Sequence, residues 1–128
     1  TFQPTTPFME TEDIDKCIEI LINNSDLTSS FTSAFITERP EAMYYYNENG
    51  KAEKYYKEKI PGGATQLLPK MVFPNGGAFA TRRDNLFKDS ELMTAKAGTH
   101  LMSYEKSIDI DHPIDFEFAD YIAKKMNK

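Results

Sequence analysis

Two aspartates near the end of the chain, Asp109 and Asp111, are the residues whose type and spacing most clearly suggest chemistry. They lie two positions apart in the segment Ser107–Asp111, and in extended backbone such residues point to the same side. Two carboxylates held together repel each other unless a cation lies between them. Open α/β sheets bind ligands beyond the carboxyl ends of their strands. The spacing therefore favours a magnesium site. The alternatives are that both side chains alternate outward on an edge strand, or that Asp111 assists the start of the next helix.

The elements that must position these aspartates follow from the spacing of the apolar residues. Isoleucines and leucines at helical intervals predict a helix that begins with Thr11 as its N-cap and ends near Asn23. Pro113 suits the first turn of a C-terminal helix, and a short helix is expected near residues 83–87. Strands are predicted over residues 27–37, 78–81 and 100–104. Residues 74–77 lead into the second of these strands, and Asn75-Gly76 is most simply a turn, which does not exclude a role in a pocket. Alternating helices and strands favour an α/β fold.

A β-hairpin is expected in the middle of the chain. Residues 43–46 and 52–56 flank the tetrapeptide Asn47–Gly50, whose Asn-Gly step accommodates positive φ angles. The tyrosines and lysines of these stretches could suggest a surface for single-stranded nucleic acid. Glutamates interleaved with the lysines cancel the positive charge, so a contact between subunits is the favoured interpretation.

The bulk properties narrow the class of protein. The chain has 128 residues, enough for one domain, and its net charge of −5 argues against electrostatic binding of nucleic acid. Its one cysteine, Cys17, can form no internal disulfide and is expected in the core, which favours a reducing, cytoplasmic compartment. No apolar stretch reaches the length of a membrane helix, and no export leader is recognisable. His100 and His112 lack local ligand partners, which argues against a zinc site.

Three short segments occur in a fixed order along the chain. They are Phe2–Phe8, then Gln66–Pro69 with Pro74–Phe79, then Ser107–Asp111 followed by Asp115. The first resembles the Leu-Gln-Pro-Thr-Ser-Pro-Leu loop of the acylneuraminate cytidylyltransferases, the CMP-sialic acid synthetase family. The second resembles that family's Gln-x-Leu-Pro and Asn-Gly-Ala-Ile-Tyr segments, and the third its Ser-Ile-Asp-Ile-Asp motif with the following aspartate. The match runs over nearly the whole chain but corresponds to the C-terminal portion of the family.

This resemblance implies a fold and a reaction. The fold would be a Rossmann-like nucleotide-diphospho-sugar transferase fold. Residues 1–128 would form a single domain from its C-terminal part, with a β-hairpin dimerisation insertion at about 38–73. The reaction would be nucleotidyl transfer, in which a hydroxyl of a nonulosonic, sialic-type acid sugar attacks the α-phosphorus of CTP. The products would be a CMP-sugar and pyrophosphate. The partners implied are CTP, the acidic sugar and a second copy of the chain, with no nucleic acid and no membrane.

The resemblance also assigns roles to individual residues. Asp109 and Asp111 would be the catalytic pair and would hold Mg²⁺ or Mn²⁺, which takes oxygen ligands and keeps water and substrate in its shell. Gln3 would hydrogen-bond the sugar, as the matching family glutamine does. Gln66 and Asn75 would help to shape the sugar pocket.

The chain departs from the family pattern in two respects. The glycine-, lysine- and arginine-containing loop that holds the triphosphate in the family has no counterpart here, which implies a fragment that is inactive alone. Where the family often has arginine, this chain has Met9 and Thr65. Basic groups bind a sugar carboxylate, so the identity of the acidic sugar stays open. The alternative function is a non-catalytic sugar-binding or dimerisation module on the same fold.

Overall fold

A computed structural model describes residues 1–57 and 68–126 of the chain. These residues divide between two compact units, one made of residues 1–34 and 73–126 and the other lying within 35–72. Each unit is considered by itself. Gln66, one of the residues expected to shape a sugar pocket, lies outside the described residues.

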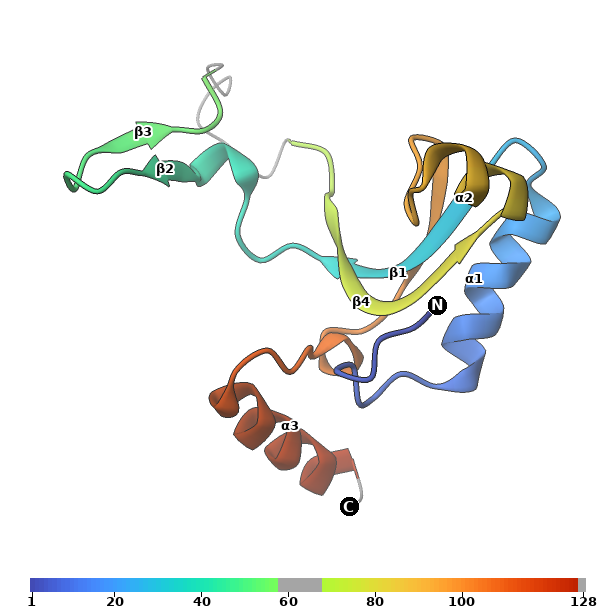
Figure 1. Ribbon diagram of the computed structural model, residues 1–128. Helices are drawn as coiled ribbons and strands as arrows, with labels where there is room; N and C mark the ends of the chain where they lie inside the picture. The colour runs from blue at the N-terminus through green and yellow to red at the C-terminus, as the bar shows by residue number, and fades with distance from the viewer. Residues whose placement is uncertain (58–67, 127–128) are drawn as a thin grey trace. The chain divides into compact units, whose positions relative to one another are not determined.

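The first unit is built on a three-stranded sheet with the order β4-β1-β5 (Figure 1). The strands are β1 (Ser29–Phe35), β4 (Val72–Thr81) and β5 (Ala97–Leu101). β1 and β5 are parallel, from the pair Ser29 and Ala97 to the pair Ser33 and Leu101. β4 runs the other way, since the Arg82 amide donates to the Thr28 carbonyl while the Ala78 amide donates to the Thr32 hydroxyl. The sheet is therefore mixed, and the chain has a mixed α/β fold, as the alternation of elements predicts.

The first residues of the chain run along the other side of β4. Phe2 forms an isolated antiparallel bridge with Ala78. The Gln3 amide donates to the Gly77 carbonyl at 3.3 Å, and the Phe79 amide donates to the Thr1 carbonyl at 2.8 Å. This pairing fixes the position of Gln3 directly beside the middle of β4.

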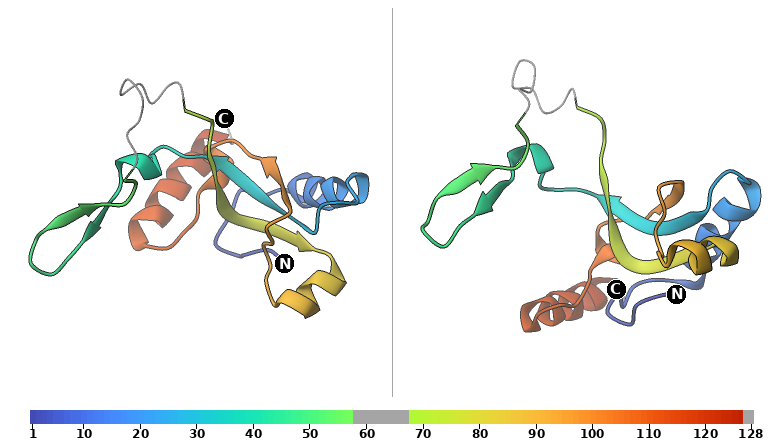
Figure 2. Two further views of the ribbon diagram at one scale, coloured as in Figure 1. Left: turned by 90° about the horizontal axis from the view of Figure 1, so that it is seen from above. Right: turned by 45° about the horizontal axis from the view of Figure 1, so that its top comes forward.

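Helix α1 (Thr11–Asn23) packs against β5. Its buried residues Asp13, Cys17 and Leu21 recur every fourth position and form one face, whereas Ile18 and Ile22, at the same helical spacing, are exposed. The helix comes close to the strand because Gly98 carries no side chain, and a Cβ there would lie 2.4 Å from Ile20 Cγ2. α3 (Pro113–Met126) lies apart from α1 in every view (Figure 2).

The N-cap of α1 is Glu10, so the prediction of Thr11 is wrong by one residue. The cap is set by the third residue of the helix, because the carboxylate of Asp13 accepts a hydrogen bond of 2.9 Å from the Glu10 amide. Such a reciprocal contact satisfies a backbone donor that the helix leaves open, which makes Glu10 the boundary.

The predicted turn at Asn75-Gly76 is also wrong, because β4 continues through it. The sequence Pro-Asn-Gly-Gly is a turn signature, but here Gly76 adopts a φ of 76° inside the strand. A glycine with positive φ lets a strand bend without ending its pairing, and β4 is visibly curved in Figure 1. β5 begins and ends three residues earlier than predicted, so Met102–Tyr104 lie beyond its carboxyl end.

The two remaining helices of this unit agree with the sequence. α2 covers Arg83–Asp89, and α3 begins at Pro113. The Asp115 carboxylate accepts hydrogen bonds from the amides of Asp111 and His112, which anchors the start of α3.

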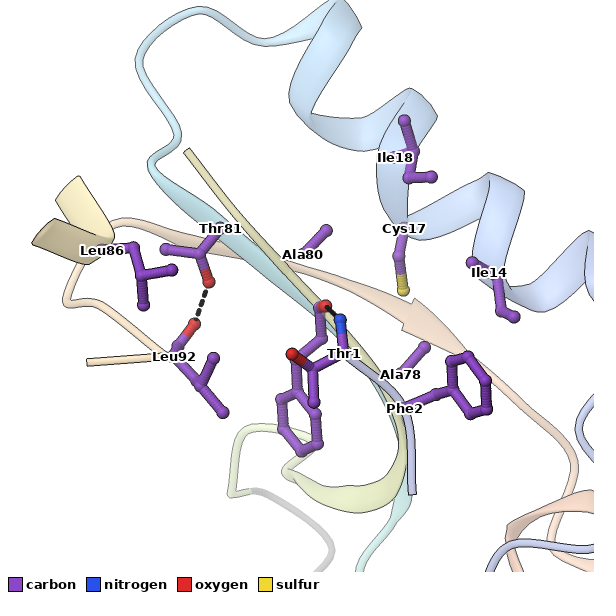
Figure 3. Close-up of a pocket in the computed structure, with 11 residues that line it drawn as sticks. Thr1, Phe2, Ile14, Cys17, Ile18, Ala78, Ala80, Thr81, Leu86 and Leu92 are labelled. Carbon is purple, nitrogen blue, oxygen red and sulfur yellow. Dashed lines mark hydrogen bonds between the residues drawn. The ribbon is translucent and has the colours of Figure 1, made fainter. Parts of the chain in front are cut away.

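An apolar pocket of about 270 Å³ lies among the N-terminal residues, α1, β4 and α2 (Figure 3). Its side chains are apolar apart from two threonines and Cys17, so it offers little for polar chemistry.

The second unit contains the predicted β-hairpin. β2 (Tyr44–Tyr46) and β3 (Ala52–Lys54) are antiparallel, and Gly50 in the connecting turn has a φ of 71°. The Asn47 side chain accepts hydrogen bonds from two amides of the turn. Within the described residues, no helix combines the length and apolar character that crossing a bilayer requires.

Candidate active site

Two of the residues singled out from the sequence, Gln3 and Asp109, approach the bend of β4. A Cβ placed on Gly76 would lie 2.5 Å from Oε1 of Gln3 and 3.1 Å from Oδ2 of Asp109. The side chains of Gln3 and Asp109 therefore approach the same glycine from segments more than 100 positions apart in sequence. Asn75 is the neighbour of that glycine. The missing side chain of Gly76 is what leaves room for both polar groups.

Asn75 is 2 % exposed, and its amide is fully used by partners within the protein. Its Oδ1 accepts hydrogen bonds from the Thr32 hydroxyl at 2.6 Å and from the Gly77 amide at 3.2 Å. Its Nδ2 donates to the Ser107 hydroxyl at 2.8 Å and contacts the sulfur of Met102 at 3.2 Å. An amide with two donors and two acceptor positions is saturated by these contacts. Asn75 thus links β4, β1 and the segment after β5, and it positions the bend beside Gly76.

The segment that carries Asp109 follows a short 3-10 helix, Glu105–Ser107. It therefore does not directly follow the carboxyl end of a strand. Ser107 donates its hydroxyl to the Ser103 carbonyl at 2.8 Å, and Asn75 donates to that same hydroxyl. The Ile110 amide donates to the Thr5 carbonyl at 3.0 Å. This backbone hydrogen bond joins the loop that bears Gln3 to the segment that bears Asp109.

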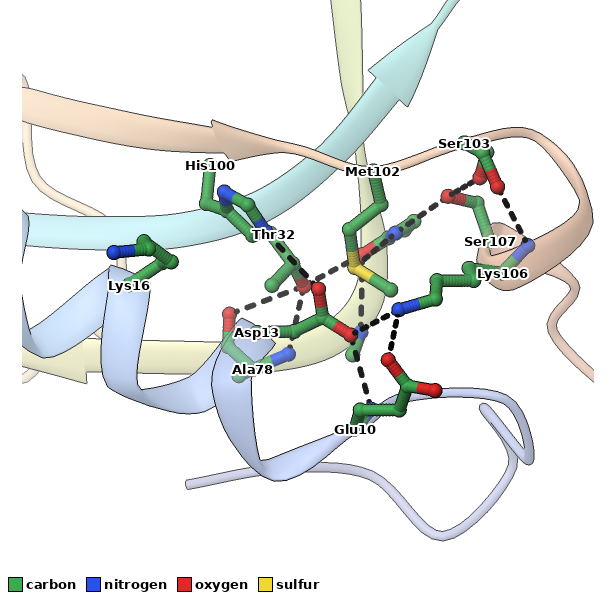
Figure 4. A network of polar contacts seen from close by, with 12 residues as sticks. Glu10, Asp13, Lys16, Thr32, Ala78, His100, Met102, Ser103, Lys106 and Ser107 are labelled. Carbon is green, nitrogen blue, oxygen red and sulfur yellow. Dashed lines mark hydrogen bonds and ion pairs between the residues drawn. The ribbon is translucent and has the colours of Figure 1, made fainter.

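A charged network fastens the same 3-10 helix to the start of α1 (Figure 4). Lys106 Nζ pairs with the carboxylate of Glu10 and lies 3.4 Å from Oδ2 of Asp13. The other carboxylate oxygen of Asp13 lies 3.0 Å from Nε2 of His100. Sequence reasoning missed this network. Its one local signal was Lys106, directly before the Ser-Ile-Asp motif, but the partners of this lysine, Glu10 and Asp13, lie 96 and 93 positions away.

Electrostatics favour the ionised forms of Asp13 and Lys106. Burial acts to raise the pKa of Asp13, but hydrogen bonds from the Glu10 amide and His100, together with Lys106, outweigh it. The pKa of Asp13 therefore lies below its ordinary value of 3.8. The hydrogen bond to Glu10 raises the pKa of Lys106. Burial and the neighbouring Asp13 charge raise the pKa of the Cys17 thiol to about 11, so this cysteine is a poor nucleophile.

The two predicted metal ligands have different surroundings. Asp109 is partly buried, and its Oδ1 is inaccessible to water and has no hydrogen-bond partner in the described part of the chain. Asp111 is exposed, and its amide helps to anchor α3 through Asp115. A buried carboxylate oxygen without a partner is costly, and a bound cation would relieve that cost.

Magnesium does not require a preformed protein cage, and the carboxylate of Asp109 has the oxygen chemistry that this ion prefers. No group of three or more histidine, cysteine, aspartate or glutamate side chains suited to a metal occurs in residues 1–57 and 68–126. Magnesium is usually held by one or two carboxylates and completes its shell with water and substrate phosphate. Asp109 Oδ1 lacks a partner but is inaccessible to water, so a hydrated ion would approach the other oxygen, Oδ2. Asp111 lies on the exposed side of the loop.

The sequence was also compared with known proteins. No model of a protein family matches this chain, and a search among curated proteins found no relative.

Proposed function

We propose that this chain is the sugar- and metal-binding portion of a CTP-dependent cytidylyltransferase that activates a nonulosonic acid. The observation that carries the proposal is the approach of Gln3 Oε1 and Asp109 Oδ2 to the same glycine in the bend of β4. An amide that can orient a sugar hydroxyl and a carboxylate that can bind a cation are the two groups such a site requires. Residues outside this sequence would contribute the triphosphate side.

The proposed reaction forms a bond between a sugar oxygen and the α-phosphorus of CTP. The bond between that phosphorus and the pyrophosphate oxygen breaks, and the hydroxyl proton leaves to water or to a carboxylate. Magnesium, when bound, neutralises charge on the phosphates and aligns them. Asp109, with Asp111 as the second candidate ligand, would hold the ion. Gln3 would bind and orient the sugar, and Asn75 would keep the bend of β4 in place.

The fold and assembly expected from the family belong to this proposal as well. Parallel β1 and β5 direct their carboxyl ends to one edge of the sheet, and Met102 and Ser107, which contact Asn75, follow β5 in the chain. This parallel pair supports a Rossmann-like fold, in which the chain that follows β5 contributes to the site at the bend of β4. In the second unit, the exposed tyrosines of the hairpin support its proposed role as a dimerisation insertion, since aromatic residues are favoured at interfaces. They are Tyr44, Tyr45, Tyr46 and Tyr55.

The decisive experiment measures pyrophosphate release by the complete protein with CTP, Mg²⁺ and a panel of nonulosonic acids. Asp111→Asn is expected to lower mainly turnover, and Gln3→Ala is expected to raise mainly the KM for the sugar. Asp26→Asn, an exposed carboxylate on the loop after α1, is the matched control and should behave like the unmodified protein. Unchanged turnover in Asp111→Asn would remove that residue from the proposed metal site.

The alternative proposal is a non-catalytic sugar-binding or dimerisation module on the same fold. A titration of the chain with Mn²⁺, followed by paramagnetic line broadening, separates the two. A catalytic portion should bind the ion weakly and lose binding in Asp109→Asn. A binding module should show equal, non-specific broadening in both forms, and the complete protein should then release no pyrophosphate.

A further inference from the structure

A cavity of about 230 Å³ lies beside Asp109, between the 3-10 helix and the start of α3. It is smaller than the roughly 300–1,000 Å³ of pockets that hold drug-sized ligands. A single ring with its substituents is therefore a better match than a nucleotide. Gln3 and Asn75 do not line this cavity, and Asp109 is the residue that it shares with the contacts at Gly76.

Aromatic side chains form much of the wall. Phe73, Tyr104 and Phe118 are 37 %, 57 % and 47 % exposed, respectively, so their rings remain available for contact. Aromatic faces carry a negative quadrupole and attract cations as well as the polarised C–H groups of a sugar ring. A hydrated magnesium ion takes oxygen ligands, so the aromatic rings of this wall favour a sugar ring over that ion.

The polar part of the lining is acidic. Asp109 and Asp115 both line the cavity, and no lysine, arginine or histidine among the described residues does. Asp115 Oδ2 already accepts hydrogen bonds from the two amides at the start of α3, and Asp109 Oδ1 is inaccessible to solvent. Asp109 Oδ2 is therefore the oxygen left to accept a hydrogen bond from a ligand. Carboxylates accept hydrogen bonds from ammonium and hydroxyl groups and repel another carboxylate.

We propose that this cavity binds the amino- or hydroxyl-bearing part of a sugar ring, with preference for an ammonium substituent and against a carboxylate. The inference rests on the proposed function in so far as the ring belongs to the activated sugar. In that case the amino-substituted side of a nonulosonic acid enters the cavity, and its carboxylate must be recognised by other residues.

Three methyl glycosides with the same ring test this preference: methyl glucosaminide, methyl glucoside and methyl glucuronide. Each is titrated into the chain without CTP or metal, and binding is followed by NMR chemical shifts. We expect the glucosaminide to bind roughly tenfold more tightly than the glucuronide, a difference of about 1.4 kcal/mol, with the neutral glucoside between them. Tighter or equal binding of the glucuronide, or binding of none of the three, would overturn the proposal.

Aromatic variants locate the binding. Tyr104→Ala and Phe118→Ala should each weaken glucosaminide binding at least about fivefold, because each removes a ring from the wall. Tyr121→Ala is the matched control, since Tyr121 is similarly exposed on α3 but does not line the cavity. Tyr104 is more than half exposed, so its loss should leave the melting temperature unchanged. If Tyr104→Ala and Phe118→Ala bind the glucosaminide as tightly as the unmodified chain does, the sugar binds elsewhere.

The outcomes also separate this inference from the proposed function. If the complete protein releases no pyrophosphate but the order of the glycosides holds, the cavity is a sugar site and the cytidylyltransferase proposal fails. If pyrophosphate is released while the glucuronide binds best, the transferase proposal stands and this inference fails.

Discussion

Two carboxylates in the first unit, Asp13 and Asp109, differ in burial and in hydrogen bonding. Asp13 is buried and Asp109 is partly buried. The oxygens of Asp13 contact the Glu10 amide, His100 and Lys106. Asp109 leaves Oδ1 buried and without a partner in the described residues. A buried acceptor without a hydrogen bond costs about 1–3 kcal/mol, and more when it is charged. Asp13 therefore stabilises the fold, whereas Asp109 lowers stability in a place where a ligand could compensate for it.

The largest expected effect that would test this contrast is that of Asp109→Asn on turnover. Removal of a charge that neutralises phosphate or holds the metal should lower turnover of the complete protein by roughly 100-fold or more. The melting temperature should stay equal or rise, because a neutral amide is less costly to bury than an unpaired carboxylate. Pyrophosphate release and thermal unfolding measure the two effects. A lower melting temperature would show that Asp109 is a stabilising residue like Asp13.

Gly76→Ala tests the place where Gln3 and Asp109 meet. Its φ of 76° disfavours any side chain, and the new Cβ would lie 2.5 Å from Gln3 Oε1. Left-handed backbone and overpacking together should lower the free energy of unfolding by roughly 2–4 kcal/mol. The sugar KM should also rise because Gln3 must move. Urea unfolding and steady-state kinetics provide the measurements, and a normal KM would separate Gln3 from substrate binding.

Asp13→Asn tests the paired carboxylate. At neutral pH the free energy of unfolding should fall by roughly 1–3 kcal/mol, because buried charge-assisted hydrogen bonds are lost. The pKa of Asp13 is lowered in the fold, so its contribution is complete above about 3.8 and decreases as the pH falls below that value. The difference between variant and parent should therefore shrink in acid. Chemical unfolding at several pH values measures it, and a constant difference would contradict the assigned pairing.

The smallest effect concerns the thiol next to this network. Burial and the Asp13 charge raise the pKa of Cys17 to about 11, so the thiolate is scarce at neutral pH. A disulfide reagent should modify native Cys17 at least about 100-fold more slowly than the urea-unfolded chain. In Asp13→Asn the native rate should increase slightly. Equal rates in the native and unfolded chains would show that the thiol is accessible.

Local patterns were sufficient for the parts of the fold that depend on local interactions. Helical spacing located α1 and α3, and the Asn-Gly step located the hairpin turn. The Pro-Asn-Gly-Gly segment was misjudged, because whether a glycine turns the chain or bends a strand depends on the pairing of β4 with β1. That pairing is a long-range contact and leaves no mark on the four residues themselves.

The candidate site was only partly accessible to sequence reasoning for the same reason. Gln3 and Asp109 were selected by resemblance to motifs, but their meeting at Gly76 follows from the bridge between Phe2 and Ala78. Asn75 was expected to help shape a pocket, and the structure shows its amide bonded to Thr32, Ser107, Gly77 and the Met102 sulfur. The spacing of Asp109 and Asp111 predicts a shared face only in an extended strand. The two residues lie in a loop after a 3-10 helix, so that prediction does not apply to them.

Helix α3 buries just one of its residues, Ala119, in the described structure, and its start is anchored through Asp115. A helix with so little buried surface opens by local unfolding at a far smaller free energy than the sheet. Its amide hydrogens should therefore exchange with solvent deuterium well before those of β1. Asp115 and Phe118 lie on this helix and on the wall of the acidic cavity, so occupancy of that cavity would slow the exchange of α3 selectively.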